Sequence, residues 1–460
     1  MKNEAHDSAF ECAPQDTFLF HQTKAQLPEA PSPATLDEKQ FAKKSKWLKE
    51  ELPELLVGDA LVSEALSKLE KMNRFSALIV EPELSEAEVT ESDEDKNVAV
   101  EKETLLAVAG LLAGMFGHIG AIWGFVAPGV FGCFLPETDS KQALQLADDI
   151  QKELKKANLS PAITGVAAYP MINYQKGDVL VNALKARDHA AFFGSGANVF
   201  FDAVSLNISG DKFYQVNDME QAVAEYQKAL LIDPSEVNVH NSLGVCYGLL
   251  GRSDEAEAEF DTAMWLDPAE FMAFYNKGMI KLMQNVSDQA LKLFLKADKL
   301  AKKAKTDAFE VTFHIGKLYL ESDQPDKGLE FLRRALRLKS ESAAVSACLG
   351  QCYLALDQPD EASAAFQKAV KVNPNDADSL SALGDLYLKR DKNLEIALVY
   401  CQQSVALLPD NGLLHYRLGQ AYERHNQNED ALGAYAKAAK LGYDADAAIK
   451  ALENQSGPKN

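Results

Sequence analysis

Between residues 203 and 443, apolar and small residues recur in a unit of about 34 positions. Within each unit a glycine is followed by a large residue after three positions, a small residue after twelve and an apolar residue after sixteen. Spacings of three and four residues are typical of one face of an α-helix, and each unit is long enough for two helices. The glycines, at spacings of 34, 34, 38, 34, 34 and 35 residues, are Gly210, Gly244, Gly278, Gly316, Gly350, Gly384 and Gly419.

These glycines predict close helix packing, because glycine inside a helix costs about 1 kcal/mol relative to alanine. Seven such positions at one register indicate that two helices approach closely there. The apolar residues sixteen positions later, or seventeen in the sixth unit because of a one-residue insertion, are Tyr226, Phe260, Phe294, Leu332, Phe366, Cys401 and Tyr435. Several units also close with a proline, namely Pro234, Pro268, Pro374 and Pro409.

The unit resembles the tetratricopeptide repeat, a helix–turn–helix of 34 residues. The signature tryptophan of the first helix is absent, and His240, Phe274, Leu380 and His415 stand at its place. The resemblance implies an all-α solenoid of about seven repeats over residues 203–443, followed by a capping helix and tail over 444–460. It also implies that a protein or peptide partner binds in the concave groove lined by the first helices.

One unit is longer than the others, since Gly278 and Gly316 are 38 residues apart. The extra residues fall in the lysine-rich stretch Lys292–Lys305. They indicate a longer, solvated second helix, which we favour, or a basic landing site for an acidic segment.

The front part of the chain predicts a disordered tail (1–35), a helical lead-in (36–72) and an α/β domain (73–202). Residues 1–35 are polar and interrupted by prolines, although the apolar patch Phe18-Leu19-Phe20 could dock elsewhere. In the lead-in, Pro53 separates a first helix from a second over Asp59–Met72. The elements expected in the domain are a strand Phe75–Val80, a helix Glu103–Phe116, a hairpin Ala121–Leu135, a helix Ser140–Ala157, a strand Ala162–Ala168, a helix Asp178–Phe192 and a strand Asn198–Phe201.

The stretch Thr104–Pro136 contains no charged residue, which raises the alternative of a membrane span. Seven glycines and Pro128 interrupt it, its flanks are acidic, and the positive-inside cue is absent. We therefore expect a buried helix followed by a hairpin of buried strands, and no membrane association.

The domain resembles the diguanylate-cyclase (GGDEF) family in element order and in three segments. Phe131-Gly132-Cys133-Phe134-Leu135-Pro136-Glu137-Thr138-Asp139 is similar to the strand and loop after the signature motif. Ile163-Thr164-Gly165-Val166-Ala167-Ala168-Tyr169-Pro170 is similar to the strand that ends in proline. Ala183–Phe192 is similar to the last helix. The resemblance implies an α+β fold.

The chemistry of that family is missing from the matching positions. The signature loop falls on Ala127-Pro128-Gly129-Val130-Phe131, where only Phe131 agrees. An active cyclase needs carboxylates there and on the first strand to hold two divalent cations. Glu81 and Glu83 stand near the family's metal-binding aspartates, but the acidic run 81–103 favours a solvated loop. We expect a catalytically silent domain with no metal or cofactor, which could form a homodimer or another protein contact.

Composition narrows the function further. The net charge of −21 argues against nucleic-acid binding, which needs clustered positive charge. The six cysteines show no C-x-x-C spacing of the kind that binds metals. We expect them to be small core residues of a protein in a reducing compartment. The first twenty residues show no secretory signal, so we expect a cytoplasmic protein. Neither a phosphate-binding loop nor a nucleophile elbow occurs in the sequence.

Candidate binding residues are the exposed first-helix positions that the repeat family uses for its groove. Asparagines could hold a peptide backbone through bidentate amide bonds, and aromatic side chains could bury an apolar anchor. The carboxylate-clamp variant is not supported, because its lysine and asparagine positions fall on Asn207 and Asp211. The predicted groove residues are Asn207, Asn238, Asn241, Met272, Tyr275, Asn276, Met279, Phe313 and Lys317.

Three functions remain open at the level of the sequence. We favour a non-enzymatic interaction scaffold that binds a protein or peptide through the groove. The first alternative is a nucleotidyl (diguanylate) cyclase with an atypical metal site. A weaker alternative, based on residues 104–136, is a membrane-associated assembly factor.

Overall fold

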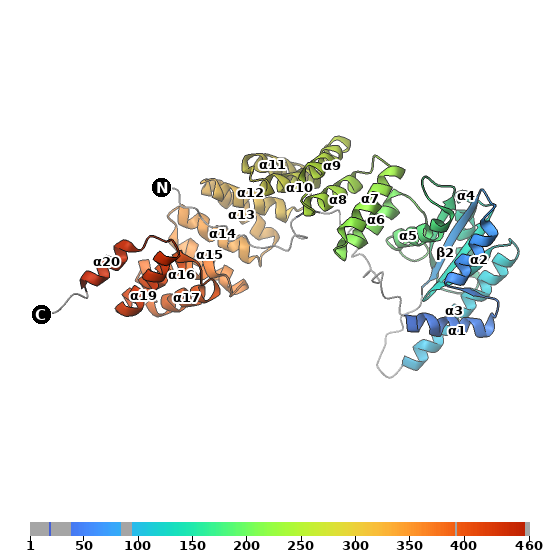
Figure 1. Cartoon of the computed structure of the whole chain (residues 1–460), viewed down its shortest axis with the longest axis horizontal. Helices are drawn as coiled ribbons and strands as arrows, with labels where there is room; N and C mark the ends of the chain where they lie inside the picture. Colours follow the sequence, from blue (N-terminus) through green and yellow to red (C-terminus); the bar gives the residue numbers. More distant parts are fainter. Residues whose placement is uncertain (1–17, 20–37, 84–93, 392, 456–460) are drawn as a thin grey trace. The chain divides into compact units, whose positions relative to one another are not determined.

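A mixed α/β sheet domain is followed by a long run of paired helices in the computed structural model (Figure 1). The structure describes residues 18–19, 38–83, 94–391 and 393–455. The described residues form two compact units, a first over Phe18–Pro268 and a second from Ala269 onwards. The first unit therefore combines the sheet domain with two helix pairs. The disordered tail predicted for residues 1–35 lies outside the described residues, apart from Phe18 and Leu19.

The sheet domain alternates helices and strands in the predicted order. Its helices are α1 (Glu38–Glu51), α2 (Asp59–Leu69), α3 (Glu94–Gly117), α4 (Ser140–Lys156) and α5 (Val179–Ala191), with a short 3-10 turn η2 (Lys176–Asp178) before α5. Its strands are β1 (Leu56–Val57), β2 (Phe75–Pro82), β3 (Ile122–Ala127), β4 (Val130–Pro136), β5 (Ala162–Tyr169) and β6 (Asn198–Phe200).

The strand order in the sheet is β1-β3-β4-β2-β5-β6. The central strand β2 pairs antiparallel with β4 and with β5, while β1 and β6 add parallel edges. Residues of β2 are buried almost throughout. Burial on both faces explains why this strand is a continuous apolar run rather than an alternating one.

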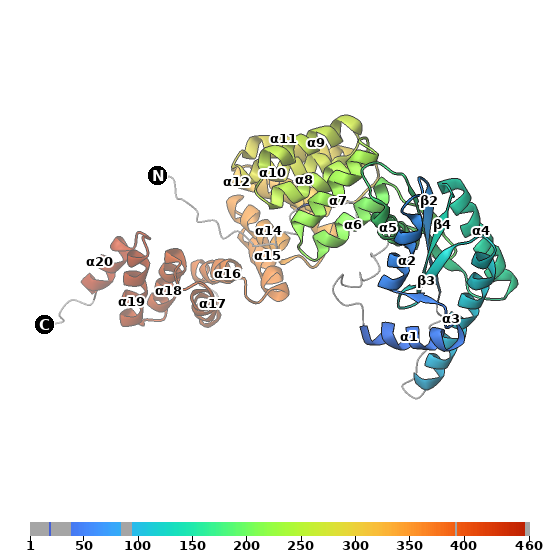
Figure 2. The same ribbon diagram turned by 45° about the vertical axis from the view of Figure 1, so that its right-hand side comes forward.

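Helices cover both faces of the sheet, α2 and α5 on one side and α3 and α4 on the other (Figure 2). Leu78 and Val80 of β2 belong to the core that α3 and α4 close. On the opposite face, a Cβ added at Gly165 of β5 would lie 2.0 Å from the carbonyl oxygen of Ala183 in α5. Glycine is needed at this position because the helix backbone rests directly on the strand.

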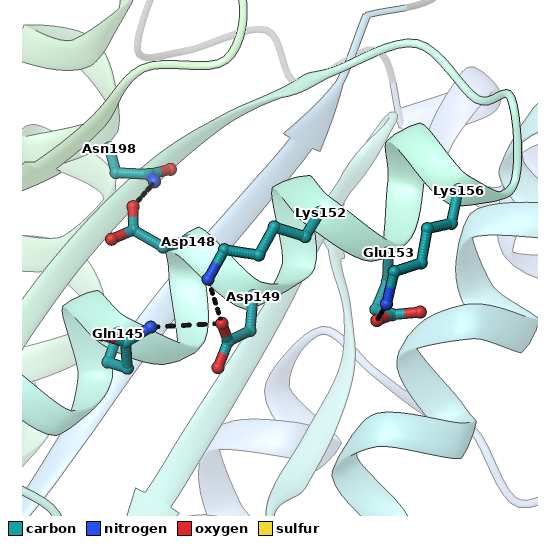
Figure 3. Close-up of polar contacts among 7 residues, drawn as sticks. All are labelled: Gln145, Asp148, Asp149, Lys152, Glu153, Lys156 and Asn198. Carbon is teal, nitrogen blue, oxygen red and sulfur yellow. Dashed lines mark hydrogen bonds and ion pairs between the residues drawn. The ribbon is translucent and has the colours of Figure 1, made fainter.

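The outer face of α4 carries a row of polar contacts (Figure 3). The ammonium of Lys152 donates to Asp149 Oδ1 at 2.7 Å, and Gln145 donates to the same oxygen at 3.1 Å. These two hydrogen bonds lower the pKa of Asp149. Asn198 of β6 donates to Asp148 Oδ1 at 2.7 Å, which ties the edge strand to the helix.

Seven helix pairs follow in the part of the chain that the structure describes. Those in the first unit are α6 (Ala203–Gln215) with α7 (Met219–Ile232) and α8 (Val237–Leu249) with α9 (Ser253–Leu266). The second unit holds α10 (Phe271–Met283) with α11 (Ser287–Lys303), α12 (Phe309–Glu321) with α13 (Pro325–Leu338), α14 (Ala343–Ala355) with α15 (Pro359–Val372), α16 (Ala377–Lys389) with α17 (Leu394–Leu407) and α18 (Gly412–Arg424) with α19 (Asn428–Lys440). The last helix is α20 (Asp446–Gln455), whose Leu452 is fully buried on the final pair.

The repeated glycines pack where the sequence predicts. A Cβ added at each would meet the apolar residue sixteen or seventeen positions later, at 2.4 Å for Gly210 with Tyr226 and 2.7 Å for Gly244 with Phe260. The same holds for the pairs Gly278 with Phe294, Gly316 with Leu332, Gly350 with Phe366, Gly384 with Cys401, and Gly419 with Tyr435. The prediction that the two helices of each pair approach closely at this register is confirmed.

Two parts of the fold differ from the prediction. Helix α3 begins at Glu94, nine residues before the expected Glu103, so the later part of the acidic run is helical and not a loop. Gly110 and Gly114 lie within α3, as they do within the predicted helix, and a Cβ at either would meet nothing within 4 Å. The lead-in belongs to the sheet domain, since β1 pairs with β3 and Leu48 joins its core.

Candidate functional site

Two asparagines occupy the same register in the first two repeats, each three residues before the repeated glycine. Asn207 lies on α6 and Asn241 on α8, and both are among the predicted groove residues. We call them, together with Asp211 one turn further along α6, the asparagine site. The third predicted residue of this unit, Asn238, is half-buried at the start of α8.

Asn241 holds a main-chain carbonyl of a distant segment. Its amide Nδ2 donates to the carbonyl oxygen of Leu19 at 3.2 Å, across 222 positions of sequence. Asn241 is only 2% exposed. Phe18, the residue before Leu19, is 5% exposed. The apolar patch singled out in the sequence is thus buried at residue 18, while its third residue, Phe20, lies outside the described residues.

Asn207 offers an unused acceptor. Its Oδ1 is buried and accepts no hydrogen bond in the structure. A buried carbonyl oxygen without a donor costs free energy, and a main-chain N–H is a donor that could satisfy it. The asparagine site therefore combines an amide that already holds a carbonyl with one that is ready to hold an N–H.

Asp211 adds a group that titrates near neutral pH. Burial raises its pKa to about 7, although the hydroxyl of Tyr226, which donates to Oδ1 at 2.7 Å, lowers it in part. Asp211 therefore changes its charge in the neutral pH range rather than in acid. The protonated form can donate a hydrogen bond, and the ionised form can only accept one.

In the second unit most of the predicted groove residues are buried. Tyr275 is fully buried against Phe294 and His314, with ring centroids 5.2 and 5.7 Å away. Phe313 and Lys317 of α12 remain partly exposed. The other three candidates on α10 are 6% exposed or less, namely Met272, Asn276 and Met279. Their role in binding stays a prediction.

His314 is held as a neutral ring beside Tyr275. Its Nδ1 lies 2.9 Å from the carbonyl oxygen of Glu310 and 3.2 Å from the hydroxyl of Tyr275. Because a carbonyl can only accept, Nδ1 carries the proton and donates. Burial lowers the pKa of His314 to about 4, so the ring is uncharged at neutral pH.

The loop 127–131, compared above with the cyclase signature, is a tight turn between β3 and β4. Gly129 has φ of +86°, and the strands on either side pair directly. The carboxylate of Glu81, which follows on the neighbouring strand β2, forms an ion pair with Arg187 of α5 at 2.8 Å. Neither Gly129 nor Val130 has a side chain that could ligate a metal.

Three other features of the described residues bear on the kind of site the chain could hold. Among the described residues, no group of three or more His, Cys, Asp or Glu side chains is arranged so that it could hold a metal ion. A hollow of about 630 Å³ in the sheet domain is lined by Glu54, Lys68 and Trp123, among others. Across the described ranges, none of the helices has the length and apolar character needed to cross a bilayer.

Comparisons with known proteins identify the repeats. The model described as "TPR repeat" matches residues 210–251, and the model described as "Tetratricopeptide repeat" matches residues 319–386. No curated protein matches the chain.

Several solved structures are similar to it. YrrB, described as a TPR protein with an unusual peptide-binding site, is 21% identical, with 41% of this chain and 95% of YrrB covered and a TM-score of 0.37. PilF of Pseudomonas aeruginosa is 21% identical, the match covers 46% of this chain and 94% of PilF, and the TM-score is 0.42. The APC/C hetero-tetramer Cut9–Hcn1 is 15% identical, the match covers 69% of this chain and 60% of that chain, and the TM-score is 0.41. The two matched stretches are therefore tetratricopeptide repeats, and the same glycine packing recurs in the other helix pairs of the array.

Proposed function

We propose that this chain is a non-enzymatic protein-interaction scaffold that binds an extended segment of a partner at the first helices of its repeats. Tetratricopeptide repeats stack into surfaces that bind proteins and peptides. The observation that carries the proposal is the asparagine site, where Asn241 holds a main-chain carbonyl and Asn207 presents a buried acceptor without a donor.

Asparagine amides suit this task because each provides both a donor and an acceptor. An extended backbone presents alternating C=O and N–H groups that such amides can bind independently of sequence. Sequence preference then comes from pockets for side chains, as in other modes of peptide recognition. Phe18, the residue before the carbonyl that Asn241 binds, is buried, so an aromatic side chain is accommodated at that position of a bound segment.

The proposal is tested by selecting binders from a random peptide library with the full-length chain as bait. Asn241→Asp keeps the size of the side chain and replaces its donor by an oxygen, so selected peptides should bind at least tenfold more weakly. Asn454→Ala, at an exposed asparagine on α20, is the matched control and should leave binding unchanged. Peptides that bind wild type and Asn241→Asp equally well would contradict this use of the asparagine site.

For the sheet domain we propose a cyclase-like fold that has lost its chemistry and serves as a contact or dimerisation module. Its support is the Pro128-Gly129 turn in place of the acidic loop and the pairing of Glu81 with Arg187. Incubation of the full-length protein with GTP or ATP and Mn²⁺ should yield no cyclic nucleotide. A cyclic product would restore the enzyme alternative, and analytical ultracentrifugation would show whether the protein forms a dimer.

A further inference from the structure

The asparagine site is occupied by the chain's own amino-terminal segment. We propose that Phe18–Leu19 is a built-in ligand of the site and that a partner strand must displace it. The proposal rests on the proposed function and names the chemistry of the partner, which is an extended strand with adjacent aromatic and aliphatic side chains.

The contacts of Phe18 and Leu19 are those expected of a bound peptide. Leu19 supplies a main-chain carbonyl to Asn241, and Phe18 supplies a buried aromatic side chain. Thr17 and Phe20 on either side lie outside the described residues. Peptide recognition commonly combines these two contacts. Main-chain hydrogen bonds provide affinity, and pockets for side chains provide specificity.

The built-in ligand leaves half of the site unused. Asn207 lies one repeat before Asn241 at the same register, yet its buried Oδ1 has no donor in the structure. A partner strand that places an N–H on Asn207 while its carbonyl meets Asn241 would satisfy both amides. Such a strand gains a hydrogen bond that the resident segment does not make, and this difference lets it compete with a ligand that is tethered to the same chain.

The first test measures whether Asn241 holds Phe18 in place, without any partner. In the full-length chain, 4-fluorophenylalanine is placed at position 18, and the solvent-isotope shift of its ¹⁹F resonance reports exposure to water. We expect a small shift in the wild-type background and a shift equal to that of a free peptide in Asn241→Asp. Asn454→Ala should behave as wild type. A fluorine that is equally shielded in wild type and Asn241→Asp would overturn the proposal.

The second test leaves the folded repeats unaltered and so remains valid if Asn241 variants unfold. A labelled peptide of residues 14–24 is titrated with the full-length chain and followed by fluorescence anisotropy. The variant F18A/L19A has an empty site, so the peptide should bind it at least tenfold more tightly than wild type. Equal affinity for the two proteins would mean that the segment does not occupy the site.

The two proposals can fail separately. If Asn241→Asp releases the fluorine but no library peptide binds F18A/L19A, the built-in ligand stands and partner recognition at this site is wrong. If library peptides bind in an Asn241-dependent way but the fluorine is not released, the scaffold stands and the built-in ligand is wrong.

Discussion

Gly244 sets the distance between α8 and α9, because its hydrogen faces the ring of Phe260. A Cβ there would lie 2.7 Å from Phe260 Cε1, and Phe260 is fully buried. Gly244→Ala should therefore lower the free energy of unfolding by about 1–3 kcal/mol through overpacking, which outweighs the helix propensity of alanine. Urea unfolding of the full-length chain measures the effect.

Gly433 of α19 is the matched control for that substitution. It lies inside a helix, is exposed, and a Cβ there would meet nothing within 4 Å. Gly433→Ala should stabilise the chain by about 0.5–1 kcal/mol, since only the propensity term acts. Stabilisation by both substitutions would show that Gly244 is not needed for close packing.

His240 links stability to pH. Burial lowers its pKa, but hydrogen bonds with Glu259 at 2.6 Å and the carbonyl of Pro234 at 3.0 Å raise it above its ordinary value overall. A raised pKa in the folded state stabilises the protein below the unfolded pKa of about 6.5, and this contribution is lost as pH rises through the folded pKa.

His240→Phe, which copies the residue at the same place in the next repeat, should remove this dependence. The difference in unfolding free energy between wild type and variant should be larger at pH 5.5 than at pH 8.5. Glu259→Gln should reduce the same difference. Parallel pH profiles for wild type and His240→Phe would argue against the charged pair.

At the scale of elements, the close fit of α5 on β5 depends on Gly165. An added Cβ would lie 2.0 Å from Ala183 O and 2.2 Å from Arg187 N, and both are main-chain atoms that cannot rotate away. Gly165→Ala should cost about 3 kcal/mol or more, at the high end for overpacking. The comparison is Gly110→Ala on the open face of α3, which should stabilise. Denaturant unfolding that shows no loss for Gly165→Ala would contradict the tight contact.

Elements with a strong internal period could be predicted from the sequence, and those defined by distant partners could not. The repeat helices follow from a spacing that each unit carries within itself. Strand β1 is only Leu56–Val57, too short for any period, and it exists because β3 lies beside it. The early start of α3 was missed because an acidic run is typical of loops, although acidic residues also stabilise the first turn of a helix.

The candidate site shows the same limit. Asn207 and Asn241 could be chosen because their shared register places them on the same side of the first helices. Tyr275 has that register too, yet it is fully buried beside Phe294 and His314. Register indicates the direction of a side chain and not its depth. The link from Asn241 to Leu19, 222 positions away, has no local signal beyond the apolar patch itself.

At the scale of the whole molecule, the sheet domain and the first helix pair share a buried ionic contact. Lys185 of α5 forms an ion pair with Glu225 of α7, which is 4% exposed and also binds Lys228 at 2.9 Å. A second pair joins Asp188 of α5 to Lys212 of α6 at 2.6 Å. These contacts fasten the first repeat to the domain before it.

Glu225→Gln should weaken this junction by about 3 kcal/mol, because it leaves the half-buried Lys185 without its counter-ion. Burial raises the pKa of Glu225, but Lys185 and the hydrogen bonds lower it overall. The stabilisation is therefore present above the unfolded pKa of about 4.3 and is lost as the pH falls through the folded pKa.

Thermal unfolding of wild type and Glu225→Gln between pH 3 and pH 7 measures this contribution. The two proteins should differ most near neutral pH and converge in acid. The double variant Lys185→Met/Glu225→Met, which removes both charges, should recover part of the loss. A Glu225→Gln protein as stable as wild type at pH 7 would show that the junction does not depend on the pair.

The junction also decides where this chain can be cut. The repeat pattern alone suggests dissection at residue 203, but an excised array starting there would keep Glu225 and lose Lys185, and the surface of α6 that α5 covers would face water. A truncation intended to yield soluble repeats should retain η2 and α5 and thus begin before Lys176. The opposite boundary is simpler, because α20 already seals the last pair with Leu452.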